Sequence, residues 1–519
     1  MHFPDFDQQG AAVAIDDASV KSGDSVLRMD GMHPLCVSLH SDGFFVQKGF
    51  VLSVSLPETL REKMKTLEIA DSGLDPSLEE ARNEILEAFS VFISVNNSYR
   101  MNVNPASGKV SPSLETFLNA LQTLKFFCDE FFSICSERLH SGPWYSVSLL
   151  WRMLYTFTTF LESLLFLLCI SIPPESPFYD INCQPLFPEM VDNASNLHQA
   201  YYFADMGLIM GGSENPLSSF LFGILDVLKK VDFSVINLQK YTFKNLSKTP
   251  SSKRIKHEWN SSSILYKSSN LEAPSKDFLR WTTDQFSFQD QFYLPQQPAL
   301  LLEAMHSSPA FHKWNNFDYF RQVAGRRTIP IEIGKLYTEE GWTQKLMTLN
   351  EFLDRYVEND AAEEVAYLAQ HPIFQQIPQL AEDIIPPDFI YCGLEDMENP
   401  LQLLWLGPKG TISPLHTDHY DNIFAQIVGV KYLRLYPPNA SESIYPYKEG
   451  PLTNTSQIQW DLHALDTKAY TSIESKFPNF LKAGFFEVIL TAGDALYIPK
   501  GWWHFVKSLS PSASVSFWF

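Results

Sequence analysis

The stretch Gly407–Asn422 reads GPKGTISPLHTDHYDN, and Gly493–Val506 reads GDALYIPKGWWHFV. In each, a short apolar run stands between turn-forming Gly, Pro and Asp residues, which is typical of a β-strand bounded by turns. Alternate side chains of an extended strand share a face, so His416 and Asp418 are expected to project together about 6.6 Å apart along the backbone. In the second stretch, His504 is expected to begin or lie in the next strand.

Two histidines and one carboxylate from neighbouring strands form the facial triad that binds non-haem Fe(II) in oxygenases. Such a triad leaves coordination positions open for a co-substrate and oxygen. We therefore predict that His416, Asp418 and His504 are the metal ligands and the catalytic centre. His419 is not expected to bind the metal, because its odd spacing puts it on the opposite face of the strand.

Short apolar runs separated by Gly, Pro and Asn continue through the C-terminal half of the chain. This pattern of short apolar runs predicts a β-barrel or a double-sheet jelly roll. A single helical stretch is expected to interrupt it at residues 350–370. The predicted strands are residues 401–406, 423–428, 432–436, 488–490, 495–498 and 515–518.

Residues 75 to about 245 have a helical pattern. Asp75-Pro76 and Ser111-Pro112 each place an N-capping residue before a proline, which predicts a helix start. Further helices are expected at residues 149–169 and 216–231. We interpret the Phe- and Leu-rich stripes of these helices as ordinary core, so the fold class is α+β.

These patterns divide the chain into four parts. Residues 1–75 are unassigned and expected to be partly disordered, and residues 76–243 form an α-helical domain. Residues 244–276 are a Ser/Lys-rich linker, and residues 277–519 form the β domain. The linker holds KTPSSKRIK (Lys248–Lys256), which has two interpretations: a solvated linker or a nuclear-localisation patch.

The amino-acid composition limits the kinds of partner that the protein is expected to bind. The 519 residues include 39 Lys and Arg against 60 Asp and Glu, a net charge of −21. Nucleic-acid binding by a bulk basic surface is therefore not expected, whereas a basic protein or peptide substrate fits the acidity. The six cysteines contain no CxxC pair, which favours reduced thiols in the nucleus or cytoplasm over a secreted protein. The apolar run at residues 164–172 is too short to cross a membrane.

The motif HTD, followed by Lys431 and then by GDALYIPKGWWHFV, resembles the Jumonji-C (JmjC) family of 2-oxoglutarate-dependent oxygenases. That family has a double-stranded β-helix scaffold, which is a cupin-like jelly roll. The similarity covers residues 270–519 closely, including FDYFRQVAGRRTIPIEIG (Phe317–Gly334) and TLNEFLDRYV (Thr348–Val357). It covers residues 140–240 loosely and does not reach residues 1–75. Where relatives have HQDP, this chain has His-Thr-Asp-His, and Thr417 is expected to point away from the metal.

The resemblance implies Fe(II) as cofactor and 2-oxoglutarate and O2 as co-substrates. It implies that Lys431 pairs with the distal carboxylate of 2-oxoglutarate, helped by Tyr367, Ser413 and Asn422. The implied substrate-binding residues are Glu332, Gln370, Trp405 and Trp518.

Four functions remain open at this point. The preferred one is hydroxylation of an arginine side chain in a protein, since a guanidinium fork matches acceptors such as Glu332 and Gln370. A histone methyl-lysine demethylase would instead rely on an aromatic cage. The third possible function is an inactive scaffold protein, whose helical region would bind partner proteins. The fourth is a cupin-type Zn or Mn isomerase. The intact triad disfavours the scaffold, and an isomerase does not require Lys431.

Overall fold

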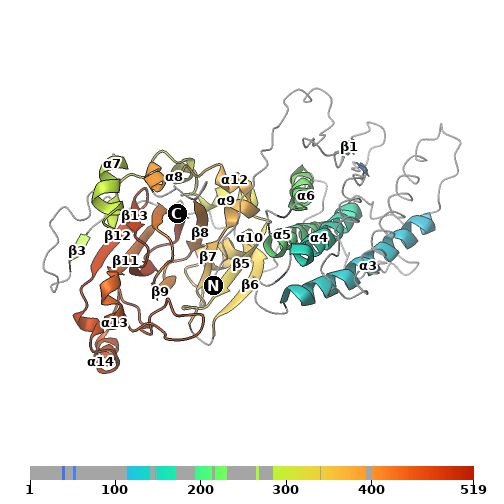
Figure 1. The fold of residues 1–519 in the computed structure, drawn as a ribbon. Coiled ribbons are helices and arrows are strands. Elements are labelled where there is room, and N and C mark those ends of the chain that lie inside the picture. The colour runs from blue at the N-terminus through green and yellow to red at the C-terminus, as the bar shows by residue number, and fades with distance from the viewer. Residues whose placement is uncertain are drawn as a thin grey trace. The chain divides into compact units, whose positions relative to one another are not determined.

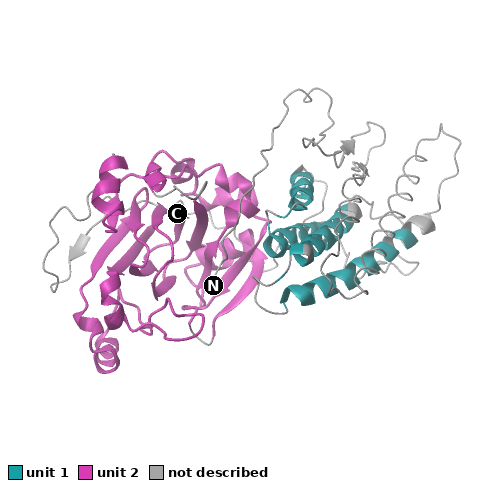
Figure 2. Ribbon diagram, viewed as in Figure 1, with its two compact units in different colours: residues 1–247 teal, residues 248–519 magenta. Residues whose placement is uncertain are grey.

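The computed structural model divides the chain into two compact units, residues 1–247 and residues 248–519 (Figure 2). Each unit has its own hydrophobic core. The predicted basic patch at Lys248–Lys256 and the helix start at Asp75-Pro76 lie outside the described residues. The structure describes residues 38–40, 51–53, 114–140, 147, 149–170, 193–212, 215, 217–230, 265–267, 285–338, 341–392 and 400–519.

The first unit is helical (Figure 1). It contains α3 (Leu114–His140), α4 (Leu149–Ile170), α5 (Asn193–Gly211) and α6 (Ser218–Lys230), besides a two-stranded ribbon of β1 (Ser38–His40) and β2 (Val51–Ser53). Helix α4 packs against α3 and α5, and its Phe and Leu residues from Leu154 to Leu167 are buried, as predicted for ordinary core, whereas Leu149 at its start is exposed. None of the described helices is long and apolar enough to cross a membrane.

The second unit contains two antiparallel sheets. The larger has eight strands in the order β4-β13-β10-β15-β8-β7-β5-β6. The bounds of these strands are β4 Ala299–Leu301, β5 Thr328–Ile333, β6 Thr343–Thr348, β7 Ala366–His371, β8 Leu401–Gly407, β10 Asn422–Val428, β13 Ala495–Ile498 and β15 Ser512–Trp518.

The smaller sheet has five strands in the order β3-β12-β11-β14-β9. The bounds are β3 Leu265–Lys267, β9 Ile412–His416, β11 Val430–Tyr436, β12 Phe486–Thr491 and β14 Trp503–Ser508. The predicted fold class is confirmed: helices precede two antiparallel sheets that form a cupin-like β-sandwich.

Alternation along the strands separates three apolar layers. In β11, Leu433 and Leu435 face the space between the sheets, whereas Tyr432 and Tyr436 face outward. The outer face of the small sheet is covered by α13 (Ser441–Ile444), α14 (Thr467–Lys476) and the short turns η7 (Pro438–Ala440) and η8 (Phe480–Lys482). The outer face of the large sheet packs on short helices, namely α7 Gln285–Phe288, η4 Gln289–Tyr293, α8 Pro309–Lys313, α9 Phe317–Ala324, α10 Leu349–Phe352, η5 Leu353–Val357, α11 Ile373–Gln376, α12 Pro378–Ala381 and η6 Asp388–Cys392.

The helix predicted at residues 350–370 is only half correct. The chain is helical to Val357, at the end of η5, but residues 366–371 form β7. Ala366 and Tyr367 pair with β5, and Leu368 and His371 pair with β8, so tertiary pairing overrides the local helical pattern.

The corner between β10 and β11 carries the chain from one sheet to the other through Gly429. Its φ of 80° is in the left-handed region, and a Cβ there would lie 2.1 Å from the carbonyl oxygen of Pro511. Only glycine fits both the conformation and the close approach. The corner lets Asn422 in β10 and Lys431 in β11 contribute to one region from opposite sheets.

Candidate functional site

The three predicted metal ligands meet at the end of the small sheet. His416 is the last residue of β9, and it is the direct cross-strand partner of His504 in β14. Asp418 lies just beyond the strand end, with its Oδ1 3.6 Å from His416 Nε2 and its Oδ2 3.5 Å from His504 Nε2. Among the described residues, these three are the one group of metal-binding side chains whose ligand atoms converge, and His419 is not part of it.

Backbone carbonyls fix the orientation of both imidazoles. His416 Nδ1 is 2.7 Å from the carbonyl oxygen of Pro414, and His504 Nδ1 is 3.0 Å from that of Trp502. A carbonyl oxygen can only accept, so each Nδ1 donates a proton to it and each Nε2 is left facing Asp418. Burial, and after it the neighbouring His416, lowers the pKa of His504 to about 4, so its imidazole is neutral and able to bind a metal.

This donor set fits Fe(II). Two neutral imidazoles and one carboxylate are the ligands of the facial triad, and hydrogen bonds that orient metal-binding histidines are usual around such sites. Bonds of about 2.1 Å would place neighbouring ligands about 3 Å apart, so the observed spacings need to close by only about half an ångström. The residues present could therefore hold the ion.

A cavity adjoins the triad, and its walls come from both sheets. The structure brings seven of the predicted residues into its lining, and it adds three that the sequence reasoning missed. The predicted residues are His416, Asp418, His504, Tyr367, Ser413, Asn422 and Trp405, and the additional ones are Phe424, Val506 and Ser516.

Lys431 is fully buried beside this cavity. Its Nζ donates to the Tyr367 hydroxyl at 3.1 Å and lies 5.0 Å from the centre of the Phe424 ring, and both of these residues line the cavity. No acidic side chain among the described residues forms an ion pair with it. Burial lowers the pKa of Lys431 to about 7, because a buried ammonium without an anion loses its hydration. The position suits an anionic ligand.

Two of the predicted site residues also have a buried polar atom without a partner. The Oδ1 of Asn422 and the Nε1 of Trp518 have no hydrogen bond in the structure. Buried polar groups are normally satisfied, so unsatisfied ones at a cavity indicate a polar ligand. Asn422 is in the cavity lining, and Trp518 stacks on Tyr420 with ring centres 5.5 Å apart.

Glu332 lies one strand away from the cavity. It is the cross-strand neighbour of Tyr367, and its Oε2 accepts from Trp342 Nε1 at 3.3 Å. Burial raises the pKa of Glu332 to about 7, although the Trp342 hydrogen bond opposes the shift. No cation among the described residues pairs with this carboxylate.

The other predicted substrate residues occupy different surroundings. Gln370 has a φ of 51°, and it sits where the β7–β8 register shifts. Such left-handed backbone in a residue other than glycine is uncommon. Trp405 Nε1 donates to Ser516 Oγ at 3.0 Å, and its ring centre lies 5.8 Å from that of Tyr367. Glu332, Gln370, Lys431 and Trp518 are not in the lining of the small cavity itself.

A simple signal could have revealed the missed lining residues. Phe424 is two residues from Asn422, Val506 two from His504, and Ser516 two from Trp518, so each shares a strand face with a predicted residue. Trp342 lies in the β5–β6 connection, where no period identifies it. Its contact with Glu332 is visible only in the fold.

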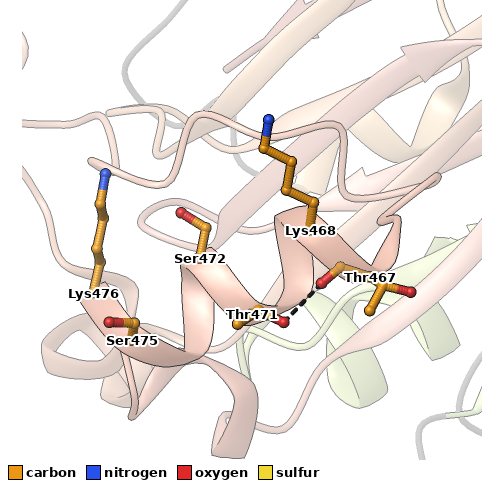
Figure 3. Close-up of a pocket in the computed structure, with 6 residues that line it drawn as sticks. All are labelled: Thr467, Lys468, Thr471, Ser472, Ser475 and Lys476. Atoms are coloured by element: carbon orange, nitrogen blue, oxygen red, sulfur yellow. Dashed lines mark hydrogen bonds between the residues drawn. The ribbon is translucent and has the colours of Figure 1, made fainter.

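A second surface depression lies on α14 (Figure 3). It is lined by hydroxyl and lysine side chains of that one helix, and Thr471 Oγ1 donates to the carbonyl oxygen of Thr467 at 2.9 Å. These residues include no carboxylate, imidazole or thiol, so they offer no set of metal ligands. The chemistry therefore belongs to the cavity between the sheets.

Two facing antiparallel sheets with a His-Asp-His cluster at one end define a cupin-like metal-binding protein. A family described as a cupin-like domain matches residues 285–519. Lysine-specific demethylase 8 of Danio rerio is 36% identical over 388 residues, covering 74% of this chain and 84% of that protein. Lysine-specific demethylase JMJ30 of Arabidopsis thaliana is 34% identical over 397 residues, covering 74% and 83%. Jumonji C domain-containing protein 5 of Drosophila melanogaster is 40% identical over 252 residues, covering 48% and 58%.

The chain therefore belongs to the JmjC family of cupin-like proteins, which confirms the resemblance noted in its sequence. With the metal-ligand triad present, it is a 2-oxoglutarate-dependent dioxygenase.

Proposed function

We propose that this dioxygenase uses Fe(II), 2-oxoglutarate and O2 to hydroxylate an arginine side chain of a protein substrate. One observation supports arginine as the substrate residue most directly. Glu332 is a partly buried carboxylate one strand from the cavity, and it has no cationic partner among the described residues. An ionised carboxylate can accept two parallel N–H bonds from a guanidinium.

In this proposal His416, Asp418 and His504 hold Fe(II), which with 2-oxoglutarate and O2 supplies the oxidant for a substrate C–H bond. Lys431 pairs with the distal carboxylate of 2-oxoglutarate. Tyr367, Ser413 and Asn422 add hydrogen bonds, and the unpaired Oδ1 of Asn422 supports a polar ligand there. In this pairing the carboxylate of 2-oxoglutarate is the anionic partner that the described residues do not provide for the buried ammonium of Lys431.

The substrate side chain would approach between Glu332 and the aromatic residues Trp405 and Trp518. A guanidinium stacks on a tryptophan face while its N–H groups reach acceptors such as Glu332 and Gln370. The substrate protein is expected to be basic around its target, because the chain carries a net charge of −21. We further propose a nuclear or cytoplasmic location, and protein binding by the helical unit.

Histone methyl-lysine demethylation is the second candidate, favoured by the names of the relatives from Danio rerio and Arabidopsis thaliana. Hydroxylation of an N-methyl group gives a carbinolamine that loses formaldehyde, so the metal chemistry is shared with arginine hydroxylation. The pocket decides between the two. A methylammonium gains from aromatic faces such as Tyr367 and Trp405, but gains little from the bidentate match of Glu332.

Mass spectrometry of peptides incubated with the enzyme, Fe(II) and 2-oxoglutarate separates the candidates. One oxygen added to arginine supports the proposal, and loss of methyl groups from lysine supports the alternative. Glu332→Gln should lower peptide hydroxylation by roughly 1.5–3 kcal/mol of transition-state binding, the cost of a hydrogen bond to a charged group. Uncoupled 2-oxoglutarate turnover should persist, because the iron site is untouched.

Replacement of the target arginine by lysine should cause a similar loss with the wild-type enzyme. The two changes should not add, because both remove one shared interaction. Glu351→Gln, a change on α10 outside the cavity, is the matched control and should leave turnover unchanged. Full additivity, or a preference for methylated lysine, would favour demethylation.

A further inference from the structure

A short segment borders the end of the metal-binding strand. Residues 454–456, which we call the strap, follow α13 in the connection to α14. The N–H of Thr417 donates to the carbonyl oxygen of Asn454, and Asn454 Nδ2 donates to the carbonyl oxygen of Thr417, each at 2.9 Å. Both peptide groups of Thr417, the residue between two metal ligands, are therefore held by the single residue Asn454.

The strap and β14 enclose the end of β9 from its two sides. His416 pairs with His504 of β14 on one side and forms an antiparallel bridge with Thr455 on the other. The strap itself is anchored, because the buried Ser456 donates its hydroxyl to the carbonyl oxygen of Ile444. Its N–H donates to the carbonyl oxygen of Leu415 at 2.8 Å. The strap is thus a fixed support for the strand end.

The side chain of Thr455 connects the strap to the β5–β6 connection. Its Oγ1 lies 3.1 Å from the hydroxyl of Tyr337. Burial raises the pKa of Tyr337 to about 12, and the negative charges of Asp418 and Glu332 contribute to the increase. A second bond, from Thr338 Oγ1 to Gln459 Oε1 at 2.5 Å, joins the β5–β6 connection to the chain three residues beyond the strap.

We propose that Asn454 and Tyr337 are positioning residues of the metal centre. Asn454 fixes the peptide between His416 and Asp418, and the Tyr337–Thr455 hydrogen bond ties that peptide to the connection that borders Glu332. A ligand pair on a strand end must lose backbone freedom when metal binds, and a residue that has already removed this freedom increases metal affinity. The inference rests on the metal site of the proposed function and not on the choice of substrate.

The proposed role of Asn454 is tested on the metal-free full-length protein. Asn454→Ala removes the side-chain bond to Thr417, and Asn454→Asp keeps the shape but cannot donate. Both should weaken Mn(II) binding in a direct titration by about 10–100-fold, the usual effect of residues that support metal ligands. Both should also alter the absorption spectrum of bound Co(II), which reports ligand geometry.

Gln457→Ala is the matched control, since Gln457 Nε2 donates to the carbonyl oxygen of Pro446 within the same connection and its side chain forms no hydrogen bond to β9. It should leave Mn(II) affinity unchanged. The thermal midpoint of each variant is measured beside its affinity. Weaker metal binding at a midpoint equal to that of Gln457→Ala supports positioning. Wild-type affinity in both Asn454 variants would overturn it.

The proposed role of Tyr337 is tested with side-chain changes that leave the backbone pairing intact. Tyr337→Phe removes the hydrogen bond between the two hydroxyls, and Thr455→Val removes this bond together with the 3.3 Å bond from Thr455 Oγ1 to Asn454 Oδ1. Each variant should weaken Mn(II) binding by about two- to tenfold. The double variant should bind no more weakly than Thr455→Val, because Thr455→Val already removes the bond to Tyr337. Additive losses, or no loss in either, would overturn the link to the β5–β6 connection.

These outcomes are separate from those that test the substrate. Mn(II) binding needs no peptide, so weak binding by the Asn454 variants supports the inference even if the wild-type enzyme does not oxidise arginine. Arginine hydroxylation accompanied by unchanged metal affinity in those variants would support the proposed function and overturn the inference.

Discussion

Asp418 is the one carboxylate in the triad, and its side chain has no role in holding the strand end. The backbone carbonyl oxygen of Asp418 accepts from the N–H of Gly501 at 3.1 Å, and an alanine would keep this bond. We predict that Asp418→Ala abolishes 2-oxoglutarate decarboxylation, because two neutral imidazoles do not offset the charge of Fe(II). The thermal midpoint of the metal-free protein should change little. Decarboxylation at the wild-type rate would contradict the assignment.

A second residue-scale prediction concerns Lys431. If its ammonium binds the distal carboxylate of 2-oxoglutarate, Lys431→Ala should weaken co-substrate binding by about 2–5 kcal/mol, the cost of breaking a buried charge pair. The Fe(II) requirement should change far less. Lys507→Ala is a suitable control, because Lys507 is on the same sheet but pairs with Asp461. Equal effects on the two requirements would show that Lys431 has no such role.

The pKa values of Glu332 and Lys431, both shifted to about 7 by burial, predict opposite pH trends. A guanidinium pairs with ionised Glu332, so the KM for the peptide should fall as pH rises from 6 to 8. A carboxylate pairs with protonated Lys431, so the KM for 2-oxoglutarate should rise over the same range. Glu332→Gln should flatten the peptide trend alone. Parallel trends for both ligands would contradict these roles.

Among single elements, three strands of the two sheets were the most predictable. Short apolar runs bounded by turns indicated β10, β11 and β13 closely, because strands buried on both faces need continuous apolar sequence. β7 was mistaken for helix, because its partners β5 and β8 are distant in sequence. The triad was predictable from spacing and from the family resemblance together. Trp342, Tyr337 and the strap were not, since their contacts depend on connections that have no periodic pattern.

The corner at Gly429 gives an element-scale prediction. Gly429→Ala should destabilise the protein by more than the ~1–2 kcal/mol that a left-handed conformation costs an L-residue, because its Cβ would also meet Pro511. Gly410→Ala is the matched control: its φ is 95°, but no atom lies within 4 Å of the added Cβ. Denaturant unfolding of both variants measures the difference. Equal losses would show that the close approach is relaxed without cost.

On the scale of the whole molecule, the two units have separate cores, and one buried acid allows them to be distinguished. Glu162 in α4 is fully buried, neither carboxylate oxygen has a hydrogen bond, and Lys125 Nζ is 3.6 Å away. Burial raises the pKa of Glu162 to about 8, although Lys125 opposes the shift. The folded helical unit therefore retains a proton that the unfolded chain releases near pH 4.5.

The stability that this proton contributes is complete below pH 4.5 and is lost as pH rises toward 8, by at most about 1.4 kcal/mol per pH unit. Glu162→Gln should remove the dependence. Calorimetry at pH 5, 6.5 and 8 tests this prediction. The unfolding transition of the β unit is recognised because its midpoint temperature rises when Mn(II) and 2-oxoglutarate are added. A difference between Glu162→Gln and the wild type in the pH dependence of that second transition would contradict separate cores.

The position of β15 has a consequence for how the β unit folds. This strand lies between β8 and β10, so without it the large sheet is two disconnected pieces. Its pairings join residues far apart in sequence, the kind of contact that forms slowly because a long loop must close first. A slip of one residue in its register would turn Phe517 inward in place of Ser516 and Trp518. We therefore expect correct docking of β15 to be a late step of folding and the step that completes the cavity, and we expect a chain trapped in the wrong register to be inactive.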